Sequence, residues 1–347
     1  MTPGNVARGG GERAGIRHVA EAAGVSMSTV SNVLNNPDLV AEATRRRVEE
    51  AMDHVGYVRN GAARQLRGAP STVVGCVLLD TANAYFATVA RGVEDRLAEA
   101  GCVLVQCSTD MRQERQAGYL RLLQEQGVRG VLISPVAADF EEFVRLGRRG
   151  TPVVLLDHPR DGATELCAVT VDNVAGGELA ARHLLDLGHR DIAFVSAGPP
   201  LRTVGDRLAG ARRALGGARR VVEIAVRETS VAAIAEAAVA RLLDLDPRPT
   251  AVICCNDAAA LGVYRGLRQR GIAVPDDISV VGYDDVDFAA ELSPALTTVR
   301  QPAYQLGHAA AALLLGEGEA GHQHTELSFR PELIPRRSTA APAAGGG

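Results

Sequence analysis

From Val73 onward the hydrophobic positions form short continuous runs separated by amphipathic stretches. In the stretch Phe86–Ala100, for example, Val89, Val93 and Leu97 share one helical face. Continuous apolar runs are typical of parallel strands that are buried on both faces, and their alternation with helices indicates βαβ units. Two groups of runs therefore predict an α/β body of two similar lobes with parallel sheets: Val73–Asp80, Cys102–Ser108, Gly130–Pro135, Val153–Asp157 and Ala168–Asp172, then Ile192–Ala197, Val221–Val226, Ala251–Asn256 and Ile278–Asp284.

The segment from Ile16 to Val55 has a different, compact helical pattern. Ala20 is small enough to let two helices approach, and Gly24 supplies a tight turn between them. Ser26 is placed to cap the second helix by accepting from the Thr29 amide or one nearby. A third helix is expected over Glu42–Val55, with Gly56 as its stop. This spacing predicts a helix-turn-helix, an all-α head that precedes the α/β body.

The second helix of such a motif enters the major groove of DNA with its first turn leading. Its outward residues Met27, Ser28 and Asn32 are the candidates for reading bases, since Asn bonds adenine bidentately and Met contacts a thymine methyl. Phosphate contacts are expected from Arg17, Thr29 and Ser31. The competing interpretation is a purely structural three-helix module with a solvated polar face.

The chain from Val19 to Tyr57, VAEAAGVSMSTVSNVLNNPDLVAEATRRRVEEAMDHVGY, resembles the DNA-binding head of the LacI/GalR family of bacterial transcriptional regulators. The similarity continues through VVGCVLLD, GVRGVLISP, LGHRDIAFV, RLAG, CNDAAALG, VPDDISVVGYDD, LTTVRQP and IPRRS. It covers roughly residues 16–338. Several independent motifs in the expected order make the resemblance specific.

The segment NGAARQL, from Asn60 to Leu66, resembles the hinge helix of that family. The resemblance implies that Asn60, Ala63, Arg64 and Leu66 contact DNA, with Leu66 as an apolar wedge in the minor groove. Gly61 destabilises a helix by about 1 kcal/mol relative to Ala, which favours a hinge helix that folds only on DNA. A linker residue that packs against the body is the alternative for Leu66.

Two residues depart from the family pattern. Arg59 stands where Pro is usual, so the turn into the hinge is expected to be looser. Asn32 stands where many members carry Arg, so the base preference of the operator is expected to differ.

For the body, the resemblance implies the fold of periplasmic sugar-binding proteins, two lobes joined by three chain crossings near 173–176, 286–292 and 320–326. The expected parts are a disordered tail 1–15, the DNA-binding head 16–58, the hinge 59–70, an N-lobe of about 71–173 and 287–322, a C-lobe of about 174–286 and 323–338, and a disordered tail 339–347.

Ligands of open parallel sheets bind beyond the carboxyl ends of the strands. Carried over by motif, the effector-binding residues are Tyr85 and Phe86 on a covering loop, Asp157 as a hydroxyl acceptor, Arg207 as the main ligand-binding arginine, and Asn256 and Asp284 as polar anchors. Carboxylates, Asn and a bidentate Arg suit a polyhydroxylated ligand.

Each of these ligand residues also has a structural interpretation. Phe86 is also a candidate core residue, Asp284 a helix cap, and Arg207 a partner of Asp206 at the surface. An aromatic residue often found near 227–230 in the family is missing, because the chain reads RETS there. The choice between a sugar and a purine-like effector therefore stays open.

Composition excludes several function classes. No apolar run approaches the roughly 18 residues of a membrane span, and the N-terminus has no apolar signal region, so a cytoplasmic protein is expected. The net charge is −4, but residues 1–70 hold 9 Arg against 7 acidic residues, a mildly basic head that suits nucleic acid. Most of the six Cys lie in apolar runs, and no CxxC pair or Cys/His cluster has the spacing of a zinc site. No nucleotide, hydrolase or metalloprotease motif is present, so neither an enzyme, a cofactor nor a metal is expected.

The sequence thus predicts a homodimeric repressor that binds double-stranded operator DNA and is controlled by a small-molecule effector, for which the polar residues carried over by motif favour a carbohydrate. The alternatives are a regulator with a purine-like or protein co-effector and an exported solute-binding protein, which would lack residues 16–67.

Overall fold

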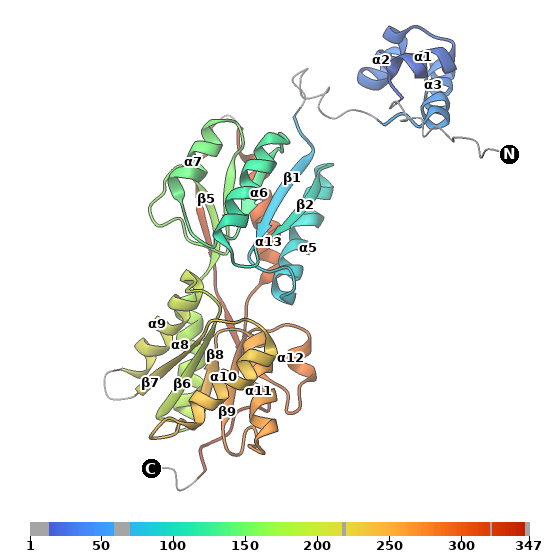
Figure 1. Cartoon of the computed structure of the whole chain (residues 1–347). Helices are drawn as coiled ribbons and strands as arrows, with labels where there is room; N and C mark the ends of the chain where they lie inside the picture. Colours follow the sequence, from blue (N-terminus) through green and yellow to red (C-terminus); the bar gives the residue numbers. More distant parts are fainter. Residues whose placement is uncertain (1–13, 59–69, 217–219, 320, 344–347) are drawn as a thin grey trace, which may run out of the picture. The chain divides into compact units, whose positions relative to one another are not determined.

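The computed structural model describes residues 14–58, 70–216, 220–319 and 321–343 (Figure 1). Its contacts divide the chain between Pro70 and Ser71 into a head and a body. The two units are taken in turn.

The head is a three-helix module with its own core. Val19, Val30 and Val48, one from each main helix, are fully buried. Gly24 and Gly56 end the first and third helices in the left-handed region, at φ 62° and 64°, as their type predicts. The elements are α1 (Ile16–Ala23), α2 (Met27–Asn35), the 3₁₀ turn η1 (Pro37–Leu39) and α3 (Glu42–Val55).

The N-lobe of the body is a six-stranded, wholly parallel sheet in the order β11-β5-β4-β3-β1-β2. Its strands are β1 (Val73–Leu78), β2 (Val103–Ser108), β3 (Gly130–Ile133), β4 (Val153–Leu156), β5 (Cys167–Val171) and β11 (Glu326–Phe329). Its helices are α5 (Ala84–Glu99), α6 (Gln113–Glu125), α7 (Phe140–Arg148) and α13 (Ala303–Gly316).

The C-lobe repeats this plan with the order β12-β10-β9-β8-β6-β7, in which β12 alone runs antiparallel to its neighbour. Its strands are β6 (Asp191–Ala197), β7 (Arg220–Val226), β8 (Ala251–Cys254), β9 (Ser279–Asp284), β10 (Thr297–Arg300) and β12 (Glu332–Ile334). Its helices are α8 (Asn173–Asp186), α9 (Arg202–Leu215), α10 (Val231–Leu243), α11 (Asp257–Gln269) and α12 (Phe288–Glu291). The predicted α/β class is confirmed, and each of the nine predicted runs overlaps a strand.

Two of the predicted lobe boundaries differ from the structure. The second crossing was placed near 286–292, but β10 pairs with β9, so the chain stays in the C-lobe to Arg300. The third crossing was placed near 320–326, but β11 pairs with β5, so the chain stays in the N-lobe to Phe329. Both errors come from four-residue strands, which are too short to stand out as apolar runs.

The predicted disordered tail from residue 339 is also corrected in its first part. The Ala340 amide donates to Ser279 Oγ at 3.0 Å, and the Ala340 carbonyl lies 2.8 Å from His189 Nε2. Ser338 Oγ donates to the Val280 carbonyl and accepts from the Thr297 amide. The end of the chain therefore fastens β9 to β10.

Glycines let the helices of each lobe pack at backbone distance. A Cβ at Gly177 of α8 would overlap the Arg207 carbonyl of α9, and one at Gly210 would overlap the Val174 carbonyl. The same arrangement, through Gly92 and Gly307, joins α5 to α13 in the N-lobe. The close contact of α8 and α9 fixes the helix that carries Arg207.

No helix in the described ranges has both the length and the apolar character to cross a bilayer.

Candidate functional site

The head presents one polar face, on α2. Ser26 caps this helix by accepting from the Thr29 amide at 3.1 Å, as the sequence predicts. Met27, Ser28 and Asn32 are exposed, whereas Val30 and Val33 on the opposite side are buried. Met27 is 57% exposed, which is unusual for a large apolar side chain and leaves it available for a partner surface.

The residues that we expect to contact DNA phosphates make hydrogen bonds or ion pairs to neighbouring residues of the head. The guanidinium of Arg17 pairs with Glu21 at 3.0 Å on the surface, and Thr29 Oγ1 lies 2.8 Å from Ser26 Oγ. Ser31 accepts from the Asn35 side-chain amide. The hinge residues Asn60, Ala63, Arg64 and Leu66 lie outside the described residues.

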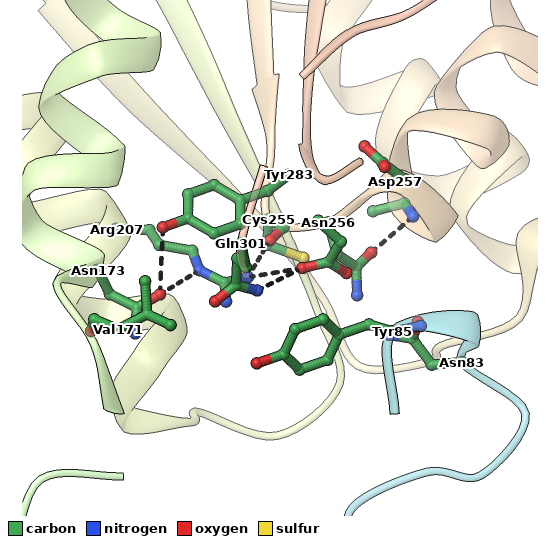
Figure 2. A network of polar contacts seen from close by, with 12 residues as sticks. Asn83, Tyr85, Val171, Asn173, Arg207, Cys255, Asn256, Asp257, Tyr283 and Gln301 are labelled. Atoms are coloured by element: carbon green, nitrogen blue, oxygen red, sulfur yellow. Dashed lines mark hydrogen bonds and ion pairs between the residues drawn. The ribbon is translucent and has the colours of Figure 1, made fainter. Parts of the chain in front are cut away.

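In the body, Arg207 of α9 lies at the centre of a buried polar cluster (Figure 2). Its Nε donates to Asn173 Oδ1 at 2.8 Å, and its Nη1 donates to the Cys255 carbonyl at 2.6 Å. The guanidinium carbon lies 3.8 Å from the ring centre of Tyr283, and the Tyr283 hydroxyl donates to the same Asn173 oxygen. The two hydrogen bonds that it donates, the stacked Tyr283 ring and burial hold the guanidinium in one orientation.

Two carboxyl groups face this guanidinium. Asp284, the last residue of β9, has Oδ1 at 4.0 Å from Arg207 Nη1 and accepts from the Gln301 amide at 2.7 Å. Burial raises the pKa of Asp284 to about 6, against the lowering effect of Arg207 and Gln301. Burial raises the pKa of Asp157 to about 7, with Arg207 opposing the shift and Asp284 adding to it.

The backbone at both carboxyl groups is unusual. Asp157 follows β4 with φ at +54°, and Asp284 has φ at +114°. Non-glycine residues rarely adopt these values, and such strain concentrates at functional sites. The fold therefore aims both side chains at the cluster at a conformational cost.

Tyr85 and Phe86, predicted as a pair, share one buried core. The rings meet edge to face with centroids 5.1 Å apart, and both side chains are buried. Burial, followed by the charges of Asp157 and Asp284, raises the pKa of Tyr85 well above its usual value. Both rings pack in the core of the N-lobe, and Tyr85 also lies within reach of the charges of the cluster, whereas Phe86 has the core environment named as its alternative.

Three polar atoms of this cluster have no partner. In the described part of the chain, five buried side-chain atoms lack a hydrogen bond, and Tyr85 Oη, Asp157 Oδ1 and Gln301 Oε1 are three of them. A buried polar atom without a hydrogen-bond partner costs about 1–3 kcal/mol, and these three atoms lie in one cluster.

Asn256 has a capping role in the structure. Its Oδ1 accepts from the Ala259 amide at 2.8 Å, at the start of α11. The next residue, Asp257, is buried and accepts from Thr298 Oγ1 at 2.7 Å and from the Val286 amide at 3.0 Å. Asn256 stays a predicted ligand residue, and its side-chain amide is not engaged by these contacts.

Asn173, Tyr283 and Gln301 belong to the cluster but were missed in the sequence. Asn173 and Gln301 stand next to chain crossings, and Tyr283 directly precedes Asp284. A polar residue at a chain crossing could have indicated a site residue, since the crossings pass between the lobes. No such indication exists for Tyr283, because an aromatic residue in an apolar run is typical of the core.

A cavity of about 960 Å³ opens beside α9, at the carboxyl ends of β6 and β7. Its walls include Val204 and Leu208 of α9, Thr229 and Ser230 of the C-lobe, and Met111 of the N-lobe. The volume is in the range of small-molecule sites. Arg207 itself is not among the residues that line this cavity, although Val204 and Leu208 of the same helix are.

Comparison with known proteins gives two matched segments. Residues 15–60 match the lacI family of bacterial regulatory proteins, and residues 181–339 match a periplasmic binding protein-like domain. The transcriptional repressor PurR of Vibrio parahaemolyticus is 35% identical over 329 residues, which cover 93% of this chain and 98% of that protein.

Solved structures agree with this assignment. The lac repressor dimer bound to operator and an anti-inducer aligns with a TM-score of 0.79 at 28% identity, over 95% of this chain and 100% of that one. A LacI-family regulator from Enterococcus faecalis with bound ribose aligns with a TM-score of 0.71 at 31% identity, over 78% and 99%. The chain therefore belongs to the lacI family of bacterial regulatory proteins, as a DNA-binding transcriptional repressor with a periplasmic-binding-protein-like body.

Proposed function

We propose that this repressor binds its operator as a homodimer and that a small polar molecule, held between the lobes at the Arg207 cluster, controls the binding. The observation that carries the proposal is the set of unpartnered buried atoms on Tyr85, Asp157 and Gln301. Tyr85 and Asp157 belong to the N-lobe, whereas Arg207 belongs to the C-lobe. A molecule that satisfies them bonds to both lobes and favours one interlobe angle, which is how binding is coupled to a second site.

On the DNA side, Met27, Ser28 and Asn32 of α2 are proposed to read bases. Protein two-fold symmetry is mirrored in the site, so the operator is expected to be a near-palindrome. The mildly basic head supports phosphate binding by Arg17, and the hinge residues Arg64 and Leu66 stay sequence-based predictions.

The ligand is expected to carry several hydrogen-bond donors. Asp157 Oδ1 and Gln301 Oε1 are acceptors, and Arg207 can hold an oxygen of the same molecule. Adjacent hydroxyl groups meet these demands, so a sugar or sugar derivative is our first candidate. The relative with bound ribose supports this class.

A nucleobase is the second candidate. The buried Tyr85 offers a flat face and an unpartnered hydroxyl, and ring N–H groups would serve the same acceptors. A base held between two aromatic faces needs a second ring from the C-lobe, and the cavity beside α9 shows Thr229 and Ser230 in the segment 227–230 instead.

The test is footprinting of the full chain on its own upstream region, repeated with a panel of sugars and nucleobases. A protected palindrome that one compound releases or strengthens supports the proposal and decides between inducer and corepressor. Protection that no compound changes would leave the repressor and overturn the small-molecule control, in favour of a protein co-effector.

Variants of α9 connect the response to the cluster. Arg207→Lys keeps the charge but cannot reproduce the two directed bonds, so it should lose the response and keep operator binding. Arg212→Lys, on the same helix but 55% exposed, is the matched control and should respond as the parent does. An unchanged response of Arg207→Lys would show that the effector site lies elsewhere.

A further inference from the structure

Four side chains with metal-binding atoms converge at the edge of the N-lobe sheet, away from the Arg207 cluster. Cys167 begins β5, Glu317 follows the end of α13, and His322 and His324 lie in the segment that leads into β11. One ligand atom from each residue lies within 4.8 Å of all the others. Cys167 stands 155 residues before His322, so spacing along the chain could not reveal the group.

Three of the four separations between the histidine nitrogens and the other two ligand atoms match a tetrahedral site, and the fourth, from Cys167 Sγ to His324 Nδ1, is a few tenths of an ångström longer. Cys167 Sγ lies 3.3 Å from His322 Nε2 and 3.9 Å from His324 Nδ1. Glu317 Oε1 lies 3.3 Å from each of the same two nitrogens. With Zn–S of about 2.3 Å and Zn–N or Zn–O of about 2.0–2.1 Å, tetrahedral geometry places neighbouring ligand atoms about 3.3–3.6 Å apart.

The surroundings also suit a cation. The Glu317 side chain is only 8% exposed, so its carboxylate is a buried charge that a bound cation would balance. The Thr325 amide donates to Cys167 Sγ at 3.4 Å, a contact that stabilises a thiolate, and Arg160 donates to the His324 carbonyl at 3.1 Å. Such outer hydrogen bonds orient the ligands of protein metal sites.

We propose that Cys167, Glu317, His322 and His324 form a zinc site. The donor set of one thiolate, two imidazoles and one carboxylate is borderline soft, which suits Zn²⁺ and disfavours Mg²⁺ or Ca²⁺. Four protein ligands leave no open position, so the site is structural. On binding, the Cys167 thiol releases its proton to solvent, and the sulfur bonds the metal as a thiolate.

The place of the site in the fold defines its effect. The four ligands join β5, the end of α13 and the segment before β11, and β11 leads directly into the crossing to β12 in the C-lobe. Because β11 has only four residues and is an edge strand, it has few other constraints. Bound zinc would therefore stabilise the N-lobe at the point where the chain crosses from β11 to the C-lobe.

The experiment uses the untagged full chain, stripped with a chelator, reloaded with Zn²⁺ and freed of excess metal by gel filtration. We expect one zinc per chain by mass spectrometry of the metal content and a rise in Tm on the order of 5 °C. Loading with Co²⁺ instead should give the visible bands of a tetrahedral site and a thiolate charge-transfer band.

Variants separate this site from adventitious binding. Cys167→Ser should remove the charge-transfer band and most of the affinity, and His322→Gln, a partly exposed position that tolerates the change, should remove the bound zinc. The controls are Cys107→Ser and His308→Gln, half-buried residues of the same lobe, which should bind zinc as the parent does. Zinc content and Tm shift unchanged in both Cys167→Ser and His322→Gln, or no retained zinc in the parent, would overturn the proposal.

Discussion

Asp157→Asn should stabilise the empty body while weakening its response to the effector. The parent Asp157 carboxyl is buried, one of its oxygens has no partner, and burial raises its pKa from 3.8 to about 7. Between these pH values the folded body holds a proton that the unfolded chain has released. Stability from this group therefore falls as the pH rises from about 4 to 7 and stays low above 7.

The size of the effect follows from the two pKa values. At about 1.4 kcal/mol per pH unit, the interval corresponds to roughly 4 kcal/mol as an upper figure. Asparagine carries no charge and tolerates the left-handed backbone at φ +54° at least as well as aspartate. The variant should match the parent near pH 4 and exceed it by up to roughly 4 kcal/mol at pH 8.

The assay is urea unfolding followed by circular dichroism over a pH series, for the parent and the variant side by side. Asp80→Asn is the matched control, because Asp80 accepts from the Ala82 amide at 2.9 Å and asparagine keeps that bond. The control should show no comparable gain in stability over the parent at pH 8. Equal stability of the parent and Asp157→Asn at pH 8 would refute the reasoning, since the buried charge would then cost nothing.

Three further perturbations address the head and the helix pair α8–α9. Ser26→Ala removes the cap on the Thr29 amide and should lower the unfolding free energy of the head by about 1 kcal/mol, measured by thermal unfolding; a loss near zero would mean that the Ser26 cap contributes nothing. Asn32→Ala should change base preference at one position per half-site in a binding-site selection, whereas a uniform loss across sequences would mean a phosphate contact. Gly177→Ala forces α8 away from the Arg207 carbonyl and should lower the Tm of the body and blunt the effector response together, and a normal response would separate the helix contact from the site.

The sequence predicted most of the fold because its long elements carry strong local signals. Strands such as Val153–Leu156 are buried on both faces and read as apolar runs, and the Ser26 cap and Gly24 turn follow from residue type. The edge strand β11 was not predicted, because it is short and largely exposed and shows no alternation of buried and exposed residues. Its place in the N-lobe depends on pairing with β5, a contact over a long separation that no local pattern encodes.

The candidate site was predictable only through the resemblance and the ends of strands. Tyr85, Asp157, Arg207 and Asp284 follow that logic, and the pKa shifts show them interacting. Asn173 and Gln301 were not predicted, because their role depends on two crossings meeting at one place. The zinc ligands were missed for the same reason, since Cys167 and His322 become neighbours only in the folded sheet.

Both lobes are completed by segments near the C-terminus, which has a consequence for a chain that is still being synthesised. The head needs only residues up to about Tyr57, and domains fold as units from the N-terminus during synthesis. The N-lobe waits for α13 and β11, and the C-lobe waits for β12 and for Ser338, which fastens β9 to β10. A nonsense mutation anywhere between the hinge and Ser338 would thus release a fragment that keeps the folded head with helix α2 but cannot complete the body that carries the Arg207 cluster.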